Sequence, residues 1–161
     1  MATPELALSA CSGLNHSRMI PLIQQHHELT IEAAGPSMVD VTAKVLAWLT
    51  SFKARDGLLT VFLRHTSASL TIQENASPSA RADLIDALNR LAPESSAYRH
   101  NSEGPDDMPA HIKAMLTSVS LSIPVFGGAL ALGTWQGVFL IEHRKRPSPR
   151  AILLHFVGSA G

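Results

Sequence analysis

The stretch from Leu58 to Gln73, LLTVFLRHTSASLTIQ, contains two alternating patterns of apolar and polar residues that are out of phase. In the first half Leu59, Val61, Leu63 and His65 lie on one side of the strand, and in the second half Ala68, Leu70 and Ile72 lie on a side of opposite parity. Because successive side chains of a strand point to opposite faces, one continuous strand cannot bury both sets. The sequence therefore predicts a bend or bulge near His65 to Ser67, a feature that often re-aims side chains beside active sites.

Three segments around this stretch have the apolar spacing of helices. The first helix is expected to begin near Ser37 or Asp40 and to end before a turn. The second begins at Ser77, with proline at its first position, and ends at Pro93. The third is shorter and covers residues 109–118. The helices therefore occupy the middle of the chain.

The remaining segments are typical of β-strands. An extended run covers residues 20–33, and three further runs follow the last helix at residues 120–125, 129–143 and 151–158. Short turns between these runs favour antiparallel pairing. The predicted fold class is α+β, most simply an antiparallel β-sandwich with about three helices packed over it.

The size and composition of the chain limit its possible functions. Its 161 residues suit a single domain, predicted over residues 19–161 after an aperiodic extension at 1–18. The 13 basic and 13 acidic residues balance, which argues against nucleic acid and anionic membranes as partners. No apolar run reaches the ~20 residues of a membrane span. The single cysteine excludes an intrachain disulfide, and the start of the chain lacks the features of a secretory signal, so we expect a cytoplasmic protein.

Five ordered blocks are similar to the YjbQ family, whose members are described as secondary thiamine-phosphate synthases. The blocks are HTSASLTIQEN, YRHN, DDMPAHIKAMLTSVSLSIPV, LGTWQG and IEHRKRPSPR. The resemblance extends from about Ile20 to Gly158. It implies a jelly-roll-like β-sandwich with helices, a homotrimer, and a thiamine-phosphate synthase-like secondary activity. That reaction joins a pyrimidine methyl diphosphate to a thiazole phosphate with loss of diphosphate.

Three histidines fall in separate blocks: His65, His100 and His111. If the fold brings them together, they can bind a divalent metal ion, zinc or magnesium, or transfer protons near neutral pH. The alternative is an ordinary structural role for each histidine, in a strand, a loop and a helix start. We take His65, Glu74 and Asp107 as the candidate catalytic residues.

The hydroxyls of Thr66, Ser67 and Ser69 follow the predicted bend. Hydroxyl and backbone N–H groups at such a position can donate to phosphate oxygens, although serine and threonine are also common on the solvent face of a strand. Glu74 and Asn75, at the end of the next strand, can position a base or a metal-bound water. Asn75 is therefore a candidate ligand-binding residue, and the alternative for Glu74 is an ordinary solvated loop carboxylate.

Two other segments supply candidate ligand-binding residues. In LGTWQG, Thr134 and Gln136 share one side, and Trp135 is expected to be a core anchor rather than a stacking platform for a ligand. The cluster at residues 143–150 is basic, and Arg144 is its candidate for binding a phosphate group. A solvated hairpin tip is the alternative for this cluster.

Two classes of function follow. The first is an enzyme, a metal-assisted transferase that acts on a small phosphorylated ligand. The second is a non-catalytic trimeric module that binds a metal ion or a small anion through the same residues. The sequence has no glycine-rich phosphate loop and no aspartate-rich metal motif, so we expect synthase chemistry to be secondary to another role of the protein.

Overall fold

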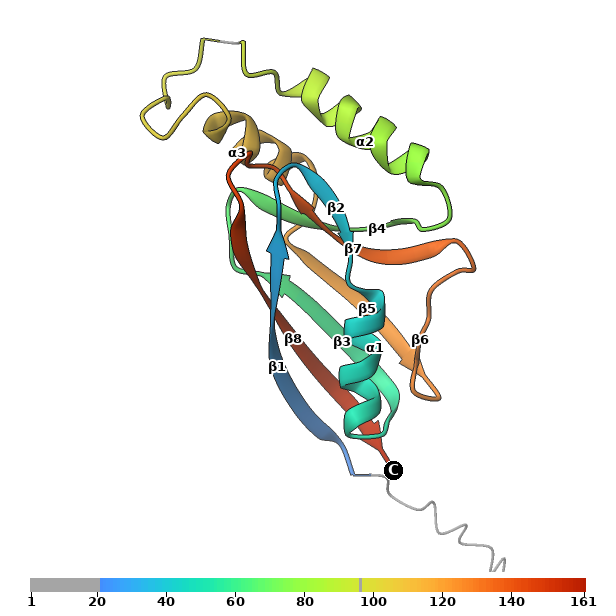
Figure 1. Cartoon of the computed structure of the whole chain (residues 1–161). Helices are drawn as coiled ribbons and strands as arrows, with labels where there is room; N and C mark the ends of the chain where they lie inside the picture. Colours follow the sequence, from blue (N-terminus) through green and yellow to red (C-terminus); the bar gives the residue numbers. More distant parts are fainter. Residues whose placement is uncertain (1–20, 96) are drawn as a thin grey trace, which may run out of the picture.

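The strands of the computed structural model form two antiparallel sheets (Figure 1). The structure describes residues 21–95 and 97–161, so the predicted extension at 1–18 lies outside the described residues. In chain order the elements are β1 (Ile23–Ala33), β2 (Ser37–Asp40), α1 (Thr42–Ser51), β3 (Ala54–Leu63), β4 (Ala68–Glu74), α2 (Pro78–Leu91), α3 (Asp107–Leu116), β5 (Ser120–Phe126), β6 (Ala129–Leu130), β7 (Gln136–Glu142) and β8 (Ser148–Ala160). The prediction of an antiparallel α+β fold is confirmed, and residues 21–95 and 97–161 contain three helices, as expected.

The phase change after Leu63 marks the passage of the chain from one sheet to the other. β3 lies in the five-stranded sheet, whose order is β1-β8-β3-β5-β6, and β4 lies in the three-stranded sheet, whose order is β2-β7-β4. The alternate apolar residues of β3 and the start of β4 are buried in one shared core. Residues 64–67 connect the two sheets and therefore turn the chain between them.

Two predicted elements differ from the observed ones. The long run at 129–143 is divided into β6, which pairs with β5, and β7, which pairs with β2 and β4. A turn interrupts it, in which the Gln136 N–H donates to the Gly133 carbonyl at 2.9 Å. Residues 37–40 form β2 instead of the first helical turn, because they pair with β7. The jelly-roll connectivity implied by the family resemblance stays a prediction.

The helices lie on different parts of the sheets. α1 contacts both β3 and β7, and its buried residues Val45 and Leu49 join the core between the sheets. α2 and α3 lie at the opposite end of the molecule from the C-terminus, beside the three-stranded sheet (Figure 1). Among the described residues, no helix has the length and apolarity needed to cross a membrane. The expected cytoplasmic location stays a prediction.

Candidate functional site

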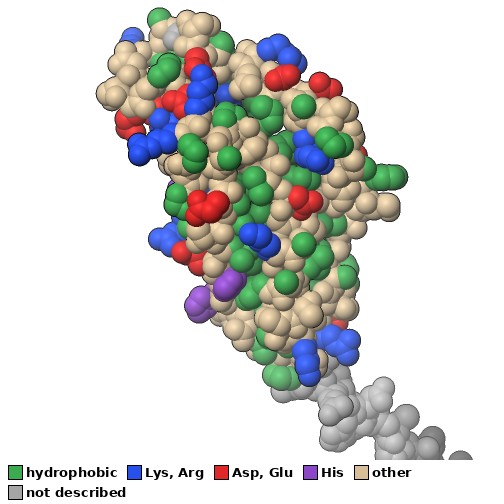
Figure 2. Space-filling model, viewed as in Figure 1, with side chains coloured by type: hydrophobic (Ala, Val, Ile, Leu, Met, Phe, Trp, Pro, Cys, Tyr) green, Lys and Arg blue, Asp and Glu red, His purple; other side chains and the backbone are tan. Residues whose placement is uncertain are grey.

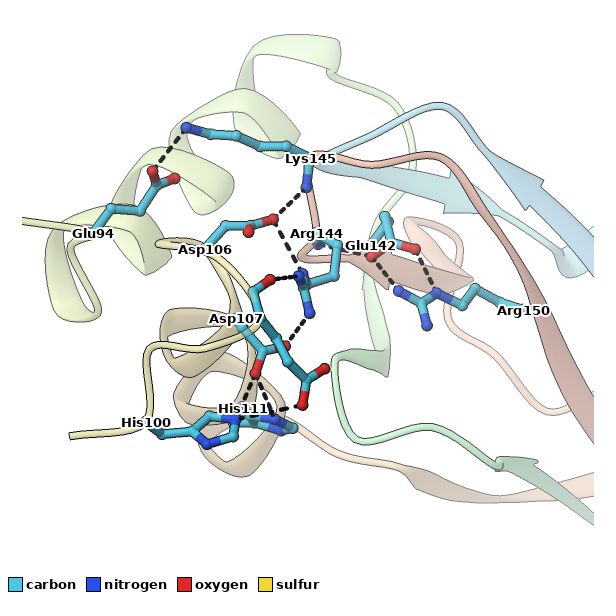
Figure 3. A network of polar contacts seen from close by, with 10 residues as sticks. Glu94, His100, Asp106, Asp107, His111, Glu142, Arg144, Lys145 and Arg150 are labelled. Carbon is cyan, nitrogen blue, oxygen red and sulfur yellow. Dashed lines mark hydrogen bonds and ion pairs between the residues drawn. The ribbon is translucent and has the colours of Figure 1, made fainter. Parts of the chain in front are cut away.

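Three side chains converge at the start of α3 (Figure 3). His100, Asp107 and His111 each offer one possible metal-ligating atom, and these atoms all lie within 4.8 Å of one another. The Asp107 Oδ2 atom is 2.7 Å from His100 Nε2 and 3.4 Å from His111 Nε2. Asp107 and His111 are four residues apart on α3 and therefore share one face of the helix.

The connection between the two sheets sets the orientation of the His111 ring. His111 Nδ1 is 2.9 Å from the Thr66 carbonyl oxygen, which can only accept a hydrogen bond. Nδ1 must therefore carry the proton, and a neutral ring then has its lone pair on Nε2, the atom that faces Asp107. The bend predicted from the sequence thus selects the tautomer that leaves Nε2 free to bind a metal ion.

Arg144 holds the other side of the Asp107 carboxylate. Its Nη1 group donates to Asp107 Oδ1, its Nε group donates to Asp106 Oδ2 at 3.1 Å, and its Nη2 group donates to the Glu103 carbonyl at 2.9 Å. Asp107 is 2% exposed, so both of its oxygens are confined by protein groups. Arg144 is a predicted phosphate ligand, but its N–H donors are hydrogen-bonded to this acidic cluster.

Asp106 fixes the loop that leads into α3. Burial by itself raises the pKa of Asp106, but hydrogen bonds from the Lys145 N–H and from Arg144 outweigh burial and lower it. The Lys145 N–H donates to Asp106 Oδ2 at 2.9 Å. Figure 2 shows basic and acidic side chains close together over the α3 end of the molecule.

A cavity of about 860 Å³ adjoins this cluster through His111. Its polar wall contains Arg64, His65, Thr66, Ser67 and Ser118. Part of its remaining wall is apolar and comes from β3, α3 and the segment before β5. The cavity therefore combines hydroxyl donors with an apolar surface, a combination typical of sites for small molecules.

His65 lines the same cavity, but its ring is hydrogen-bonded to the backbone. Its Nε2 atom accepts a hydrogen bond from the Ala151 N–H at 2.9 Å. Burial lowers the pKa of His65, and the nearby charge of Arg150 lowers it further, so the ring is neutral near pH 7. Of the three histidines predicted to bind metal, the structure brings together His100 and His111, with Asp107 in place of His65.

The predicted ligand residue Ser69 and the predicted catalytic residue Glu74 do not line this cavity. Ser69 is buried and its hydroxyl contacts His143 Nε2 at 2.9 Å. Glu74 is at the far end of β4, six residues and about 20 Å from Ala68, and its Oε1 atom accepts from the N–H groups of Ala76 and Ser77.

A second group of predicted residues gathers at the far end of β4. Asn75 Nδ2 donates to the Gln136 carbonyl at 3.3 Å, and Gln136 Oε1 accepts from the Gly133 N–H at 2.8 Å. Thr134 is exposed in the same turn. The interpretation of Trp135 as a core anchor is wrong, because this side chain is 65% exposed. The turn carries Trp135 outside the strand and away from the core.

Sequence reasoning missed a set of buried polar residues behind the site. Arg150 Nη2 donates to Glu142 Oε1 at 2.8 Å, and Glu142 is fully buried. His143 is also buried, which lowers its pKa to about 3. In the sequence, Glu142 and Arg150 lie on either side of the turn at 143–147. These two opposite charges were the feature from which the buried ion pair could have been predicted.

Comparisons with known proteins agree with one another. The family model described as "UPF0047 protein YjbQ-like" matches residues 27–159. A UPF0047 protein of Synechocystis sp. is 50% identical over 137 residues, which cover 84% of this chain and 93% of that protein. The UPF0047 protein YjbQ of Escherichia coli is 40% identical over 131 residues, which cover 81% of this chain and 95% of that protein.

Solved structures of similar chains have the same fold. An uncharacterized conserved protein of the yjbq/upf0047 family from Clostridium acetobutylicum has a TM-score of 0.74 and 33% identity, covering 80% of this chain and 97% of its own. A hypothetical protein from Aeropyrum pernix has a TM-score of 0.78 and 30% identity, covering 84% of this chain and 99% of its own.

Proposed function

This chain belongs to the UPF0047 YjbQ-like family, and on that premise we propose that it is a metal-assisted enzyme acting on a small phosphorylated ligand. The specific reaction proposed is the thiamine-phosphate synthase-like activity that the sequence resemblance implies. The observation that carries the proposal is the placement of three possible ligand atoms within 4.8 Å of one another, beside a cavity of about 860 Å³.

The residues of the cluster fit zinc better than magnesium. Two imidazole nitrogens and one carboxylate oxygen are a common zinc ligand set and leave a fourth position open, whereas magnesium prefers oxygen ligands. The hydrogen bond from His111 Nδ1 to the Thr66 carbonyl and the bond from Arg144 to Asp107 are the kind of outer contacts that orient metal ligands. A bound divalent ion would polarise a phosphoryl oxygen and offset its charge.

The cavity wall supplies the other requirements of the reaction. Thr66 and Ser67 place hydroxyl donors beside His111, where they can hold phosphate oxygens. Phe62 and Met115 supply an apolar surface on which a heteroaromatic ring can pack. Transfer of the whole pyrimidinylmethyl group to the thiazole phosphate, with diphosphate as the leaving group, also requires the exclusion of water, which this apolar wall favours.

We also propose a homotrimer, following the family resemblance. The β3 residues Leu58 and Phe62 are 47% and 41% exposed, and a partner subunit would bury them. Light scattering should give three times the mass of one chain at micromolar concentration. A stable monomer under these conditions would contradict the assembly.

The test combines metal content with turnover. After dialysis against zinc, wild-type protein should retain one zinc per chain and release diphosphate from a pyrimidine methyl diphosphate when a thiazole phosphate is present. Replacing His100→Ala or His111→Ala should remove both properties. Replacing His26→Ala, at an exposed position on β1, should leave both unchanged.

The outcomes separate the two classes of function. Stoichiometric zinc without turnover would favour the non-catalytic binding module. Turnover that survives in His111→Ala would place the chemistry elsewhere. Absence of both zinc and turnover in the wild-type protein would overturn the proposal.

A further inference from the structure

Lys113 is a buried cation on α3. It is 6% exposed, and its Nζ group donates to Asn89 Oδ1 of α2 at 2.7 Å. Within residues 21–95 and 97–161, no carboxylate oxygen lies within 4.0 Å of this nitrogen. Lys113 comes two residues after His111, and therefore about 200° further round the helix, so it points away from the metal cluster.

The nearest charged residues do not neutralise Lys113. Glu94 is paired with Lys145 at 2.8 Å, and Asp106 is engaged by Arg144 and by a backbone N–H. A buried ammonium group without an anionic partner is unfavourable by several kcal/mol. An anion bound from outside the chain would offset this unfavourable free energy.

A cavity of about 310 Å³ lies beside this group. Lys113, Asn89, His143 and Lys145 are part of its wall, which α2, α3 and the turn between β7 and β8 build. Since Asn89 Oδ1 accepts from Lys113, the Asn89 amide nitrogen is left as a further donor. The wall therefore offers at least three N–H donors to one small space.

The rim of the cavity can open at little cost. Glu94 and Lys145 both line it, and their side chains are 35% and 63% exposed. Ion pairs with this degree of exposure contribute only about 0–1 kcal/mol. An incoming anion can therefore take Lys145 from Glu94 without a large loss of stability.

We propose that this cavity binds a small oxyanion, a phosphate or a carboxylate group, with Lys113 as its main cationic ligand. Asn89 and Lys145 complete the site as additional donors. This site lies on the other side of α3 from the metal cluster and shares no residue with it. It is therefore an anion site beyond the one proposed for the reaction.

The test measures anion binding to the full-length protein, without added metal. Titration with inorganic phosphate, and separately with acetate, should raise the melting temperature of the wild-type protein. Lys113→Met has similar length and no charge, so it should weaken anion binding by about tenfold or more. The same variant should melt above the wild-type protein when no anion is present, because the unpaired charge has been removed.

Three further variants make the test specific. Lys44→Met removes an exposed lysine of α1 and should leave the anion response unchanged. His111→Ala should also retain the response, which separates this site from the metal cluster. Asn89→Asp supplies Lys113 with an internal carboxylate, so it should raise stability without anion and weaken anion binding.

The two anions distinguish the chemical source of the ligand. A response to phosphate alone assigns a phosphate group, and a response to acetate alone assigns a carboxylate. No response to either anion in the wild-type protein would overturn the proposal, as would an unchanged response in Lys113→Met.

Discussion

At the residue scale, the Asp107 carboxylate has a partner on each side. One oxygen contacts His100 and His111, and the other accepts from Arg144. A carboxylate held in this way keeps one oxygen directed at the two imidazoles. Arg144 is therefore a positioning residue, which acts on the metal cluster through Asp107.

Replacing Arg144→Gln should weaken zinc binding by about 10–100-fold, the usual effect of losing an outer contact to a metal ligand. Glutamine cannot reach Asp106, Asp107 and the Glu103 carbonyl together. Zinc affinity would be measured by competition with a chelator, with Arg64→Gln as the control on an exposed arginine. An equal loss of zinc affinity in both variants would show that the loss follows from the change in net charge and not from the contacts of Arg144.

His65→Ala should lower the free energy of unfolding by about 1–3 kcal/mol, because the Ala151 N–H loses its acceptor. Chemical denaturation of this variant would be compared with that of His100→Ala, whose loop side chain is partly exposed. We expect His100→Ala to lose zinc with little loss of stability. The opposite order of stabilities would contradict these roles.

His143 should make the protein less stable in weak acid. Its pKa is about 3 in the folded chain because of burial, against an ordinary value of 6.5, so between these values the unfolded chain binds a proton that the folded chain excludes. Unfolding free energy should fall by about 2 kcal/mol from pH 7 to pH 5. Denaturant titrations at both pH values would measure this fall, which His143→Gln should reduce.

At the element scale, β3 and β8 approach closely where two glycines face each other. Gly57 pairs with Gly158, and a Cβ atom added to Gly57 would lie 2.7 Å from the Gly158 Cα and 2.8 Å from the Phe156 ring. No side chain fits there unless the strands separate. The absence of two Cβ atoms therefore allows the central pair of the five-stranded sheet to form.

Gly57→Ala should destabilise the protein by about 3 kcal/mol, at the upper end of the cost of overpacking. Gly133→Ala is the matched control, since its added Cβ meets only ordinary contacts with Gln136 at 3.4 Å or more. Thermal unfolding of the two variants would make the comparison. A similar melting temperature for both would show that the strands adjust freely.

At the scale of the whole molecule, the metal cluster and both cavities depend on α3 lying against the end of the three-stranded sheet. α3 contacts β4 and α2, and its two faces carry His111 and Lys113. The cluster also requires the turn after β7, which supplies Arg144. Segments far apart in the chain thus meet at one end of the fold.

Deleting residues 2–17 should leave the melting temperature nearly unchanged. These residues have no apolar periodicity, and the family model matches only from residue 27. Thermal unfolding and light scattering of the truncated chain would test this expectation. A drop of many degrees, or a change of assembly, would show that the segment packs on the domain or on a partner subunit.

The local pattern of the sequence was sufficient for the fold class and for most elements. The phase change after Leu63 predicted the bend, and Ser77 with its proline predicted the start of α2, whose N-cap it forms. These features depend on nearest neighbours along the chain, where periodicity and capping act. The same pattern did not divide the run at 129–143, because the partners of β7, which are β2 and β4, are distant in sequence.

The grouping of the candidate site was decided only by tertiary structure. His65, His100 and His111 look equivalent in the sequence, yet His65 bonds to the backbone of β8 while the other two meet Asp107. Arg144 looked like a phosphate ligand because its acidic partners lie 37 or more residues earlier in the chain. Residue type determines which bonds a side chain can make, but the packing of distant segments determines which partner it has, since hydrogen bonds and charge pairs act over only a few ångströms.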